Sequence, residues 1–282
     1  MKLDHVALAT PDASRPLDVL VGELGGLVLS GGHGVGFRPM QVFMGDDTGG
    51  MKIELLEPWE AERNDFLERF ITRHGSGPHH LTFKVEDLVA TIDAVRGAGC
   101  SPVGIDLTDP VWREAFLTPK EAHGTVVQLA QSDTPLTSPL AEYRFAAEHG
   151  ASGDPVWWPD PSPRAEVPSF LRRVVLRTQS LPATVAFFTG VLRGETVATG
   201  RGWTELTWPG DGHLRIEEQI DANPGIDRLE LEGPGPAREL TVAATRLVVT
   251  PASGAAWDSD VAPASLLATP EEEPAGREAT EP

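Results

Sequence analysis

Short apolar runs and one amphipathic stretch follow each other in a fixed order over the first 60 residues. An apolar run with β-branched residues at 4–10 predicts a strand. Asp12 can cap a following helix, whose apolar residues recur over 17–24 with the i, i+3, i+4, i+7 spacing. Three more apolar runs, separated by glycine-rich turns, predict strands at 27–30, 40–44 and 51–56. The predicted order is therefore β-α-β-β-β.

This order recurs along the chain, which indicates internal duplication. After a linking helix that Asn64 can cap, the second copy has a strand at 80–85, a helix capped by Asp87, and strands near Val103, at 115–117 and at 125–130. The third copy has a strand at 171–178, a helix capped by Ser180, and strands at 195–199, 204–208 and 214–218. A partial fourth copy has a strand at 226–231 and a predicted helix at 237–245.

Composition divides the chain into four parts. Residues 1–131 hold the first two copies, and residues 169–251 hold the later, degenerate ones. Prolines interrupt residues 132–168, which we interpret as a linker with a short helix at 140–148 and with Trp157-Trp158 packed onto a domain. Residues 252–282 are rich in Ala, Pro, Ser and Glu and predict a disordered acidic tail. The expected fold class is α+β: paired βαβββ modules that curl a mixed sheet around a cleft, plus a second, degenerate domain of the same kind.

The chain is strongly acidic, because 42 Asp and Glu residues against 23 Lys and Arg give a formal charge of −19. Such a surface repels phosphate polyanions, which argues against nucleic acid and anionic membranes as partners. No apolar run approaches the roughly 20 residues of a membrane helix, and the first residues lack the apolar core of a signal peptide. The single cysteine, Cys100, excludes an internal disulfide and a cysteine-based zinc cage. We therefore expect a cytoplasmic protein.

Polar residues stand at matched places in the first two copies. His5 and Glu54, in the first and last strands of copy one, are separated by nearly the same number of residues as His80 and Gln128 in copy two. Since side chains alternate along a strand, each of the four lies on the face opposite its apolar neighbours. Imidazole nitrogens with carboxylate and amide oxygens suit a divalent ion such as Mn, Co, Ni, Fe or Zn. We therefore predict a metal site made of these four residues, with positions open for a small anionic carbonyl substrate whose enolate the ion would stabilise.

Longer stretches around these residues carry a family resemblance. They are LDHVALATPD at 3–12, KIELLEPW at 52–59, FLERFITRHGSGPHHLTFKVEDL at 66–88 and AFLTPKEAHGTVVQLAQ at 115–131. Residues 1–131 thereby resemble the vicinal oxygen chelate superfamily of glyoxalases, bleomycin resistance proteins and dioxygenases, and within it the methylmalonyl-CoA epimerases. The resemblance implies metal ligands at His5, Glu54, His80 and position 128, where the family has a glutamate and this chain has Gln128. A second catalytic glutamate of some epimerases falls nearest to Gln41.

The resemblance implies a metal-dependent isomerase or lyase that acts through the enolate of a small carbonyl acid or an acyl-CoA. An amide cannot take up a proton, so the base would be a metal-bound hydroxide, or Glu57 or Glu121 carried in by a loop. Two alternatives stay open: a small-molecule binding or resistance protein without catalysis, and an extradiol-type dioxygenase. His79 is expected either beside the ligands or in a loop, and His123 at the mouth of the cleft.

The later copies lack the ligands. Arg173 stands where the first copy has His5, Arg228 stands where the second has His80, and Glu217 keeps the acid. Two cations in place of two imidazoles argue against a metal there. Either this domain packs against the first and replaces a dimer partner, or its two arginines hold a carboxylate or phosphate. The expected assembly is a monomer with an internal pseudo-dimer, or a homodimer.

Overall fold

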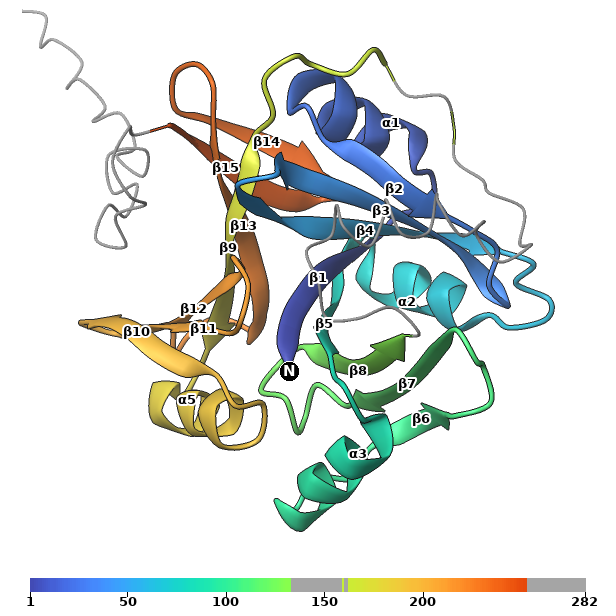
Figure 1. The fold of residues 1–282 in the computed structure, drawn as a ribbon, viewed down its shortest axis with the longest axis vertical. Coiled ribbons are helices and arrows are strands. Elements are labelled where there is room, and N and C mark those ends of the chain that lie inside the picture. Colours follow the sequence, from blue (N-terminus) through green and yellow to red (C-terminus); the bar gives the residue numbers. More distant parts are fainter. Residues whose placement is uncertain (133–158, 160–161, 253–282) are drawn as a thin grey trace, which may run out of the picture. The chain divides into compact units, whose positions relative to one another are not determined.

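In the computed structural model, which describes residues 1–132, 159 and 162–252, the strands form two sheets (Figure 1). The first sheet has eight strands in the order β2-β3-β4-β1-β5-β8-β7-β6. These strands are β1 (Lys2–Ala9), β2 (Leu27–Gly31), β3 (Gly36–Asp46), β4 (Gly49–Trp59), β5 (Gly77–Lys84), β6 (Val103–Asp106), β7 (Trp112–Leu117) and β8 (Val126–Ser132). Its helices are α1 (Ser14–Leu17), the π-helical η1 (Asp18–Glu23), α2 (Phe66–His74) and α3 (Leu88–Gly97). We call these elements the N-terminal half.

The second sheet has seven strands in the order β10-β11-β12-β9-β13-β15-β14. These strands are β9 (Phe170–Thr178), β10 (Glu195–Gly200), β11 (Trp203–Thr207), β12 (His213–Glu218), β13 (Gly225–Gly233), β14 (Arg238–Val242) and β15 (Thr245–Pro251). Together with α5 (Leu181–Gly190), they form the C-terminal half. Both sheets join two copies of a module through antiparallel central strands, β1 with β5 and β9 with β13. The predicted α+β fold of paired βαβββ modules is thus confirmed.

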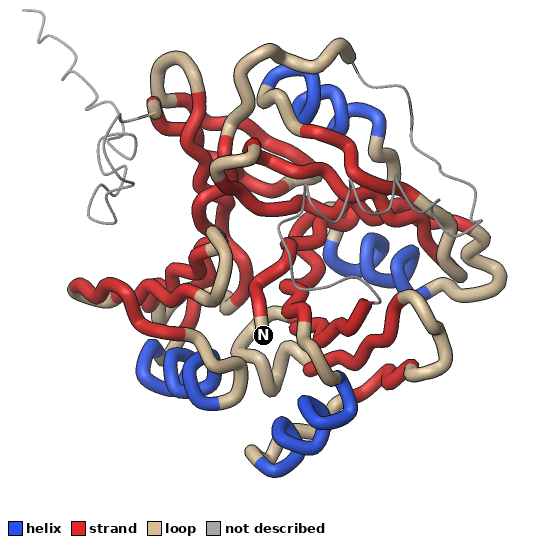
Figure 2. The backbone as a smooth tube through the Cα atoms, in the orientation of Figure 1, coloured by secondary structure: helices blue, strands red, loops and turns tan. Residues whose placement is uncertain are grey.

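The first sheet curls, with α2 inside the curve and α1 and α3 outside it (Figures 1 and 2). Strand β1 shows why both faces are covered. Val6 and Leu8 point into the large core, whereas Ala7 and Ala9 join a second cluster with Leu67 of α2. The alternation of side chains along the strand therefore divides an apolar outer face from an inner face of small and polar residues.

The large core runs through both halves of the chain. On the outer face of β5, the Phe83 ring lies 5.0 Å from that of Trp208 and 6.4 Å from that of Phe188, both from the C-terminal half. The described residues of both halves, 1–132, 159 and 162–252, accordingly belong to one compact unit. Since the C-terminal half covers the outer face, it leaves the inner face of the first sheet to α2 and the polar residues.

One predicted element is wrong. Residues 237–245 form no helix, but strand β14 and a tight turn into β15. Ala243 and Ala244 have φ values of 46° and 53°, the left-handed pair that a two-residue hairpin turn requires. Leu240 and Val242 recur with period two and pack on the core. The alanines favour a helix locally, but the buried sheet face decides the outcome.

The predicted caps have mixed outcomes. Asp87 caps α3, and its side chain accepts a hydrogen bond from the Ala90 backbone N–H. Asp12 accepts from the backbone N–H of Ser14 without occupying the N-cap of α1, and the predicted helix is split into α1 and η1.

No helix among the described residues is long and apolar enough to cross a membrane. The predicted helix at 140–148, Trp157-Trp158 and the tail from 253 lie outside the described residues.

Candidate metal centre

Three of the predicted ligands meet on the inner face of the first sheet. Ala7 of β1 pairs with Glu54 of β4 on one side and with His80 of β5 on the other. His5 lies two residues before Ala7 and therefore points to the same face. One donor atom each of His5, Glu54 and His80 lies within 4.8 Å of the other two. The duplicated modules thus supply one imidazole each to a single cluster.

The cluster is withdrawn from solvent. His5 is fully buried, His80 is 4% exposed and Glu54 is 8% exposed. The Glu54 Oε2 atom lies 3.4 Å from His5 Nε2 and 3.8 Å from His80 Nε2. Burying an ionisable group costs free energy unless the group forms an ion pair or coordinates a metal. Each donor atom of this cluster therefore needs a hydrogen bond, an ion pair or a metal ion as its partner.

Asp4 fixes the orientation of His5. The His5 Nδ1–H donates to Asp4 Oδ2 at 2.7 Å, and Lys52 Nζ donates to the same oxygen at 2.7 Å. Asp4 and Lys52 are themselves buried. Because Nδ1 is engaged, the Nε2 atom of His5 faces the cluster. A carboxylate behind an imidazole is the arrangement that commonly orients histidine ligands of metals.

The pKa values of the three cluster residues are shifted in different directions. Burial by itself lowers the pKa of His5, but the Glu54 charge and the Asp4 hydrogen bond outweigh it and raise that pKa to about 9. Burial raises the pKa of Glu54, but His5 outweighs it and lowers the value to about 2. His5 and Glu54 therefore each stabilise the charged form of the other. Burial, and next to it the charge of His79, hold the pKa of His80 well below its ordinary value.

His80 supplies the observation that bears most directly on a metal. Its Nε2 atom is buried, faces Glu54 and has no hydrogen-bond partner among the described residues. A buried polar atom without a partner carries a desolvation penalty of about 1–3 kcal/mol. A neutral imidazole with an open Nε2 is the form that binds divalent metals. Two imidazoles and one carboxylate therefore fit the predicted ion in number and chemistry.

The two predicted glutamines border the cluster. Gln41 Nε2 donates to Glu54 Oε1 at 3.3 Å. Thr82, the cross-strand neighbour of His5, donates its hydroxyl to Gln128 Oε1 at 2.6 Å. The same hydroxyl oxygen lies 2.8 Å from His5 Nε2 and accepts there, since its only proton is used. The structure thus brings both amides to the edge of the cluster.

Sequence reasoning missed one acid of this site. Glu114 lies on β7, and its Oε2 accepts from Gln128 Nε2 at 2.6 Å and from the Trp112 indole N–H at 3.1 Å. Burial raises the pKa of the Glu114 carboxyl, although the two donors lower it in part. Strand parity places Glu114 and Phe116 on one face, but the pairing of Phe116 with Gln128, which brings Glu114 to the site, depends on a register that parity does not fix.

The two acids expected to move in as bases are engaged elsewhere. Glu57 accepts from the Ala13 backbone N–H at 2.9 Å and forms an ion pair with Arg38. Glu121 accepts from the backbone N–H of Ser101 at 2.7 Å and bonds Thr118. Both side chains hold loops in place, so the structure offers no support for either as the base.

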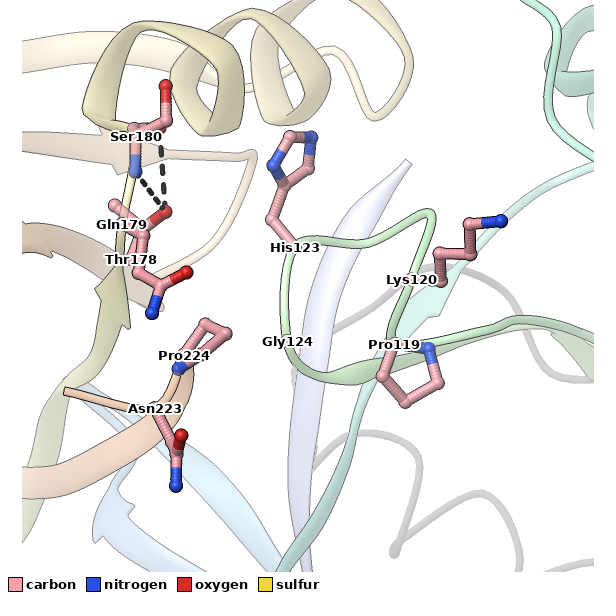
Figure 3. Close-up of a pocket in the computed structure, with 9 residues that line it drawn as sticks. All are labelled: Pro119, Lys120, His123, Gly124, Thr178, Gln179, Ser180, Asn223 and Pro224. Carbon is pink, nitrogen blue, oxygen red and sulfur yellow. Dashed lines mark hydrogen bonds between the residues drawn. The ribbon is translucent and has the colours of Figure 1, made fainter. Parts of the chain in front are cut away.

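His79 and His123, the two other histidines singled out from the sequence, lie in different places. His79 lies beside the cluster, with its Nδ1 atom 2.8 Å from His80 Nδ1 and the rings of Phe66 and Phe70 edge-on to its own. Burial lowers the pKa of His79 to about 4. His123 instead lines a cleft of about 610 Å³ between the two halves, where its ring faces α5 and lies 5.5 Å from Phe187 (Figure 3).

That cleft is separate from the cluster. It is lined by Pro119, Lys120, His123, Gly124, Thr178, Gln179, Ser180, Asn223 and Pro224. The first backbone N–H of α5, from Leu181, already donates to Glu218 Oε1 at 3.0 Å. A negative group therefore occupies the helix N-terminus that an anionic ligand would need. The expected cleft mouth at His123 is thus not part of the candidate metal centre.

The C-terminal half holds an ion-pair network at the equivalent place. Val175 of β9 pairs with Arg215 and Arg228 as Ala7 pairs with Glu54 and His80. Arg215 thus occupies the position of Glu54, and the assignment of that position to Glu217 is wrong by two residues. The register preserves the predicted matches of Arg173 with His5 and of Arg228 with His80.

The arginines of this network are neutralised internally. Arg173 contacts Glu230 at 2.8 Å and Glu205 at 3.0 Å. Arg228 contacts Glu217 at 2.7 Å and Glu230 at 2.8 Å. Since carboxylates of the same half occupy both guanidinium groups, the interpretation of this place as a site for an external anion has no support in the structure.

The fold and the cluster together define a paired-module protein with an inward-facing group of two imidazoles and a carboxylate. A family model, the glyoxalase/bleomycin resistance protein/dioxygenase superfamily, matches residues 4–116. The chain belongs to this superfamily.

Two curated relatives each match 46% of this chain. An ethylmalonyl-CoA/methylmalonyl-CoA epimerase of Cereibacter sphaeroides is 32% identical over 142 residues, which are 46% of this chain and 97% of the relative. A mitochondrial methylmalonyl-CoA epimerase of Dictyostelium discoideum is 29% identical over 135 residues, 46% of this chain and 78% of the relative. The predicted family resemblance is thereby confirmed.

A third comparison covers both halves. The crystal structure of a hypothetical protein from Staphylococcus aureus superposes with a TM-score of 0.61 at 13% identity, over 89% of this chain and 99% of that one. At this identity the match speaks for the fold alone. It shows that the arrangement of two paired-module halves in one chain occurs in another protein.

Proposed function

We propose that the N-terminal half is a metal-dependent isomerase or lyase of the vicinal oxygen chelate type. Its substrate class is a small carbonyl acid or an acyl-CoA thioester, as the names of the two epimerase relatives suggest. The observation that carries the proposal is the buried cluster of His5, Glu54 and His80, in which the Nε2 atom of His80 has no hydrogen-bond partner among the described residues.

The chain's own groups would hold a divalent ion, of Co, Mn, Ni, Zn or Fe. His5, Glu54 and His80 would be its ligands, and the carbonyl oxygen of Gln128 is the candidate for a fourth. When bound, such an ion supplies Lewis-acid stabilisation of a developing enolate, worth several kcal/mol.

The surrounding residues orient these groups and keep water out. Asp4, held by Lys52, fixes the ring of His5. Gln41 donates to Glu54 and leaves its second carboxylate oxygen toward the two histidines. On the same face, an apolar cluster shields one side of the site; it consists of Ala7, Ala9, Leu56 and Leu67 with Phe37, Phe66, Phe70 and Ile71.

The test follows a proton on the substrate. Protein loaded with Co²⁺ is incubated with methylmalonyl-CoA in D₂O, and deuterium at the α-carbon is measured by mass spectrometry. We expect exchange in the unmodified protein and a loss of roughly 100-fold or more in His5→Ala, since the Lewis-acid contribution is several kcal/mol. His123→Ala, at the separate cleft, is the matched control and should exchange normally. Absence of exchange in the loaded, unmodified protein would overturn the epimerase version.

A second candidate is a small-molecule binding protein without catalysis. The two candidate side chains at the edge of the cluster, Gln41 and Gln128, are amides and cannot take up a proton. Of the nearby carboxylates, Glu114 is hydrogen-bonded by Gln128 and Trp112, and Glu57 and Glu121 are engaged in loops. This candidate predicts stoichiometric binding of acyl-CoA or carbonyl acids with no exchange at carbon. Calorimetric titration beside the deuterium experiment separates the two.

A further inference from the structure

The amide of Gln128 presents two chemically different ends to two different neighbours. Its oxygen accepts from Thr82, which also contacts His5, on the side of the cluster. Its nitrogen donates to Glu114 at 2.6 Å, on the side away from the cluster. A flip of the amide would exchange these ends. The question is therefore what holds the oxygen on the inner side.

Glu114 holds the amide of Gln128 in this orientation, because its carboxylate can only accept hydrogen bonds. A carboxylate offers no proton, so only the NH₂ end of the amide can face it favourably. A flipped amide would place its oxygen against the Glu114 oxygens in a partly buried site, where such repulsion is strong. Thr82 alone would not decide, because a hydroxyl can donate to one end of the amide or accept from the other. Glu114 thus fixes which atom of Gln128 faces the histidines.

Glu114 is itself held in this position. The Trp112 indole N–H, which can only donate, bonds its Oε2 atom at 3.1 Å. The parallel pairing of β5 with β8 and the antiparallel pairing of β7 with β8 bring Thr82, Gln128 and Phe116 into one cross-strand row. Glu114 lies two residues from Phe116 on the same face and meets the amide diagonally, which is within reach for long side chains.

We propose that Glu114 is a positioning residue for the candidate metal centre, because it turns the carbonyl oxygen of Gln128 toward the histidine cluster. Glu114 lies behind Gln128 as seen from the cluster, and there it supplies the negative charge that a glutamate at position 128 would carry. The inference rests on the proposed metal-binding function of His5, Glu54 and His80. It assigns the second carboxylate of the centre to β7, a strand that supplies none of the ligands predicted from the sequence.

The test compares metal affinities of single and exchanged variants. Glu114→Gln has the same shape but removes the charge and lets the amide pair flip. Titration calorimetry with Zn²⁺ alone should show affinity reduced about 10-fold, the usual scale for residues that orient ligands. The exchange Glu114→Gln/Gln128→Glu puts a carboxylate on the inner position with an amide donor behind it, and should restore the affinity. Glu86→Gln removes one exposed carboxylate elsewhere and should change nothing.

A second measurement needs no metal. The side-chain NH₂ resonances of Gln128, assigned by their loss in Gln128→Met, should include one proton shifted downfield by the Glu114 carboxylate. In Glu114→Gln that proton should move upfield. Circular dichroism establishes that each variant is folded, so that a loss of affinity reports on the site.

The outcomes separate the inference from the function on which it rests. Zn²⁺ binding that His5→Ala abolishes but Glu114→Gln leaves unchanged would overturn the role of Glu114 and leave the proposed function standing. A loss in Glu114→Gln that the exchanged pair fails to restore would also overturn it, since a merely structural contact gives that result. Absence of Zn²⁺ binding in the unmodified protein would overturn the function and the inference together.

Discussion

The two halves of the chain place different chemistry at the same positions of the same scaffold. Strand register makes six positions equivalent, three of them on the central strands. In the N-terminal half these are His5, Gln41, Glu54, His80, Thr82 and Gln128; in the C-terminal half they are Arg173, Glu205, Arg215, Arg228, Glu230 and Val248. The first set leaves the Nε2 atom of His80 without a hydrogen-bond partner within the described part of the chain. The second set holds three arginines that pair with its two glutamates, and Val248 takes the sixth place.

The difference shows two solutions to one problem. Small and polar residues on the inner face of a curled sheet leave buried polar positions that need partners. The N-terminal cluster has the donor types that an ion can satisfy. The C-terminal network satisfies itself, for example through Glu205, which accepts from Arg215 and pairs with His213 at 2.8 Å.

The largest predicted effect concerns the self-sufficient network. Arg173→Met should lower the free energy of unfolding by about 3 kcal/mol, the low end of the cost of breaking a buried ion pair, because two buried carboxylates lose their shared cation but keep Arg215 and Arg228 as partners. The two carboxylates are those of Glu205 and Glu230, both held by Arg173. Urea unfolding followed by circular dichroism measures the change. Arg201→Met, at an exposed position, should stay within about 0.5 kcal/mol. Equal effects at the two sites would mean that the network adds little to stability.

The second prediction asks whether only one half responds to metal. Co²⁺ at about 100 times its dissociation constant should stabilise the protein by about 2.7 kcal/mol, since it binds the folded chain. Thermal unfolding with and without the ion measures this. The stabilisation should vanish in His80→Ala and persist in Arg228→Lys, its equivalent in the other half. Retention of the full shift in His80→Ala would place the ion elsewhere and break the comparison.

The third prediction concerns the stability of the protein at low pH. The His213 hydrogen bond and the nearby Arg173 lower the pKa of Glu205 below its ordinary 4.5, although burial acts in the opposite direction. The unfolded chain therefore binds this proton first as the pH falls, so Glu205 contributes stability above about pH 4.5 that is lost below it. In Glu205→Gln, the slope of unfolding free energy against pH in that range should flatten by up to about 1.4 kcal/mol per pH unit. An unchanged slope would show that Glu205 is not ionised differently in the two states.

The sequence predicts the cluster well because duplication and strand parity both constrain it. Parity places His5, Glu54 and His80 on one face, and the repeat places their strands at the centre of one sheet. Parity does not fix the register, since residues i and i+2 share a face. That is why Glu217 was assigned the place that Arg215 holds.

The same limit explains the missed acid. Glu114 meets Gln128 diagonally across β7 and β8, and only the pairing of Phe116 with Gln128 brings the two together. No local pattern specifies such a contact, because it depends on where two strands align. The predicted helix at 237–245 failed for a related reason: period-two burial of Leu240 and Val242 against the core outweighed the helix preference of the neighbouring alanines.

The smallest predicted effect tests that hairpin, at which the two halves differ in secondary structure. After β5 the N-terminal half continues into α3, whereas after β13 the C-terminal half continues into β14 and turns at Ala243 and Ala244. Both alanines have positive φ, which asparagine and glycine adopt more easily. The double change Ala243→Asn/Ala244→Gly should therefore stabilise the protein by about 0.5–1 kcal/mol in urea unfolding. If this stretch were helical, glycine in its interior would instead destabilise it by about 1 kcal/mol, so the sign of the change distinguishes the turn from the helix.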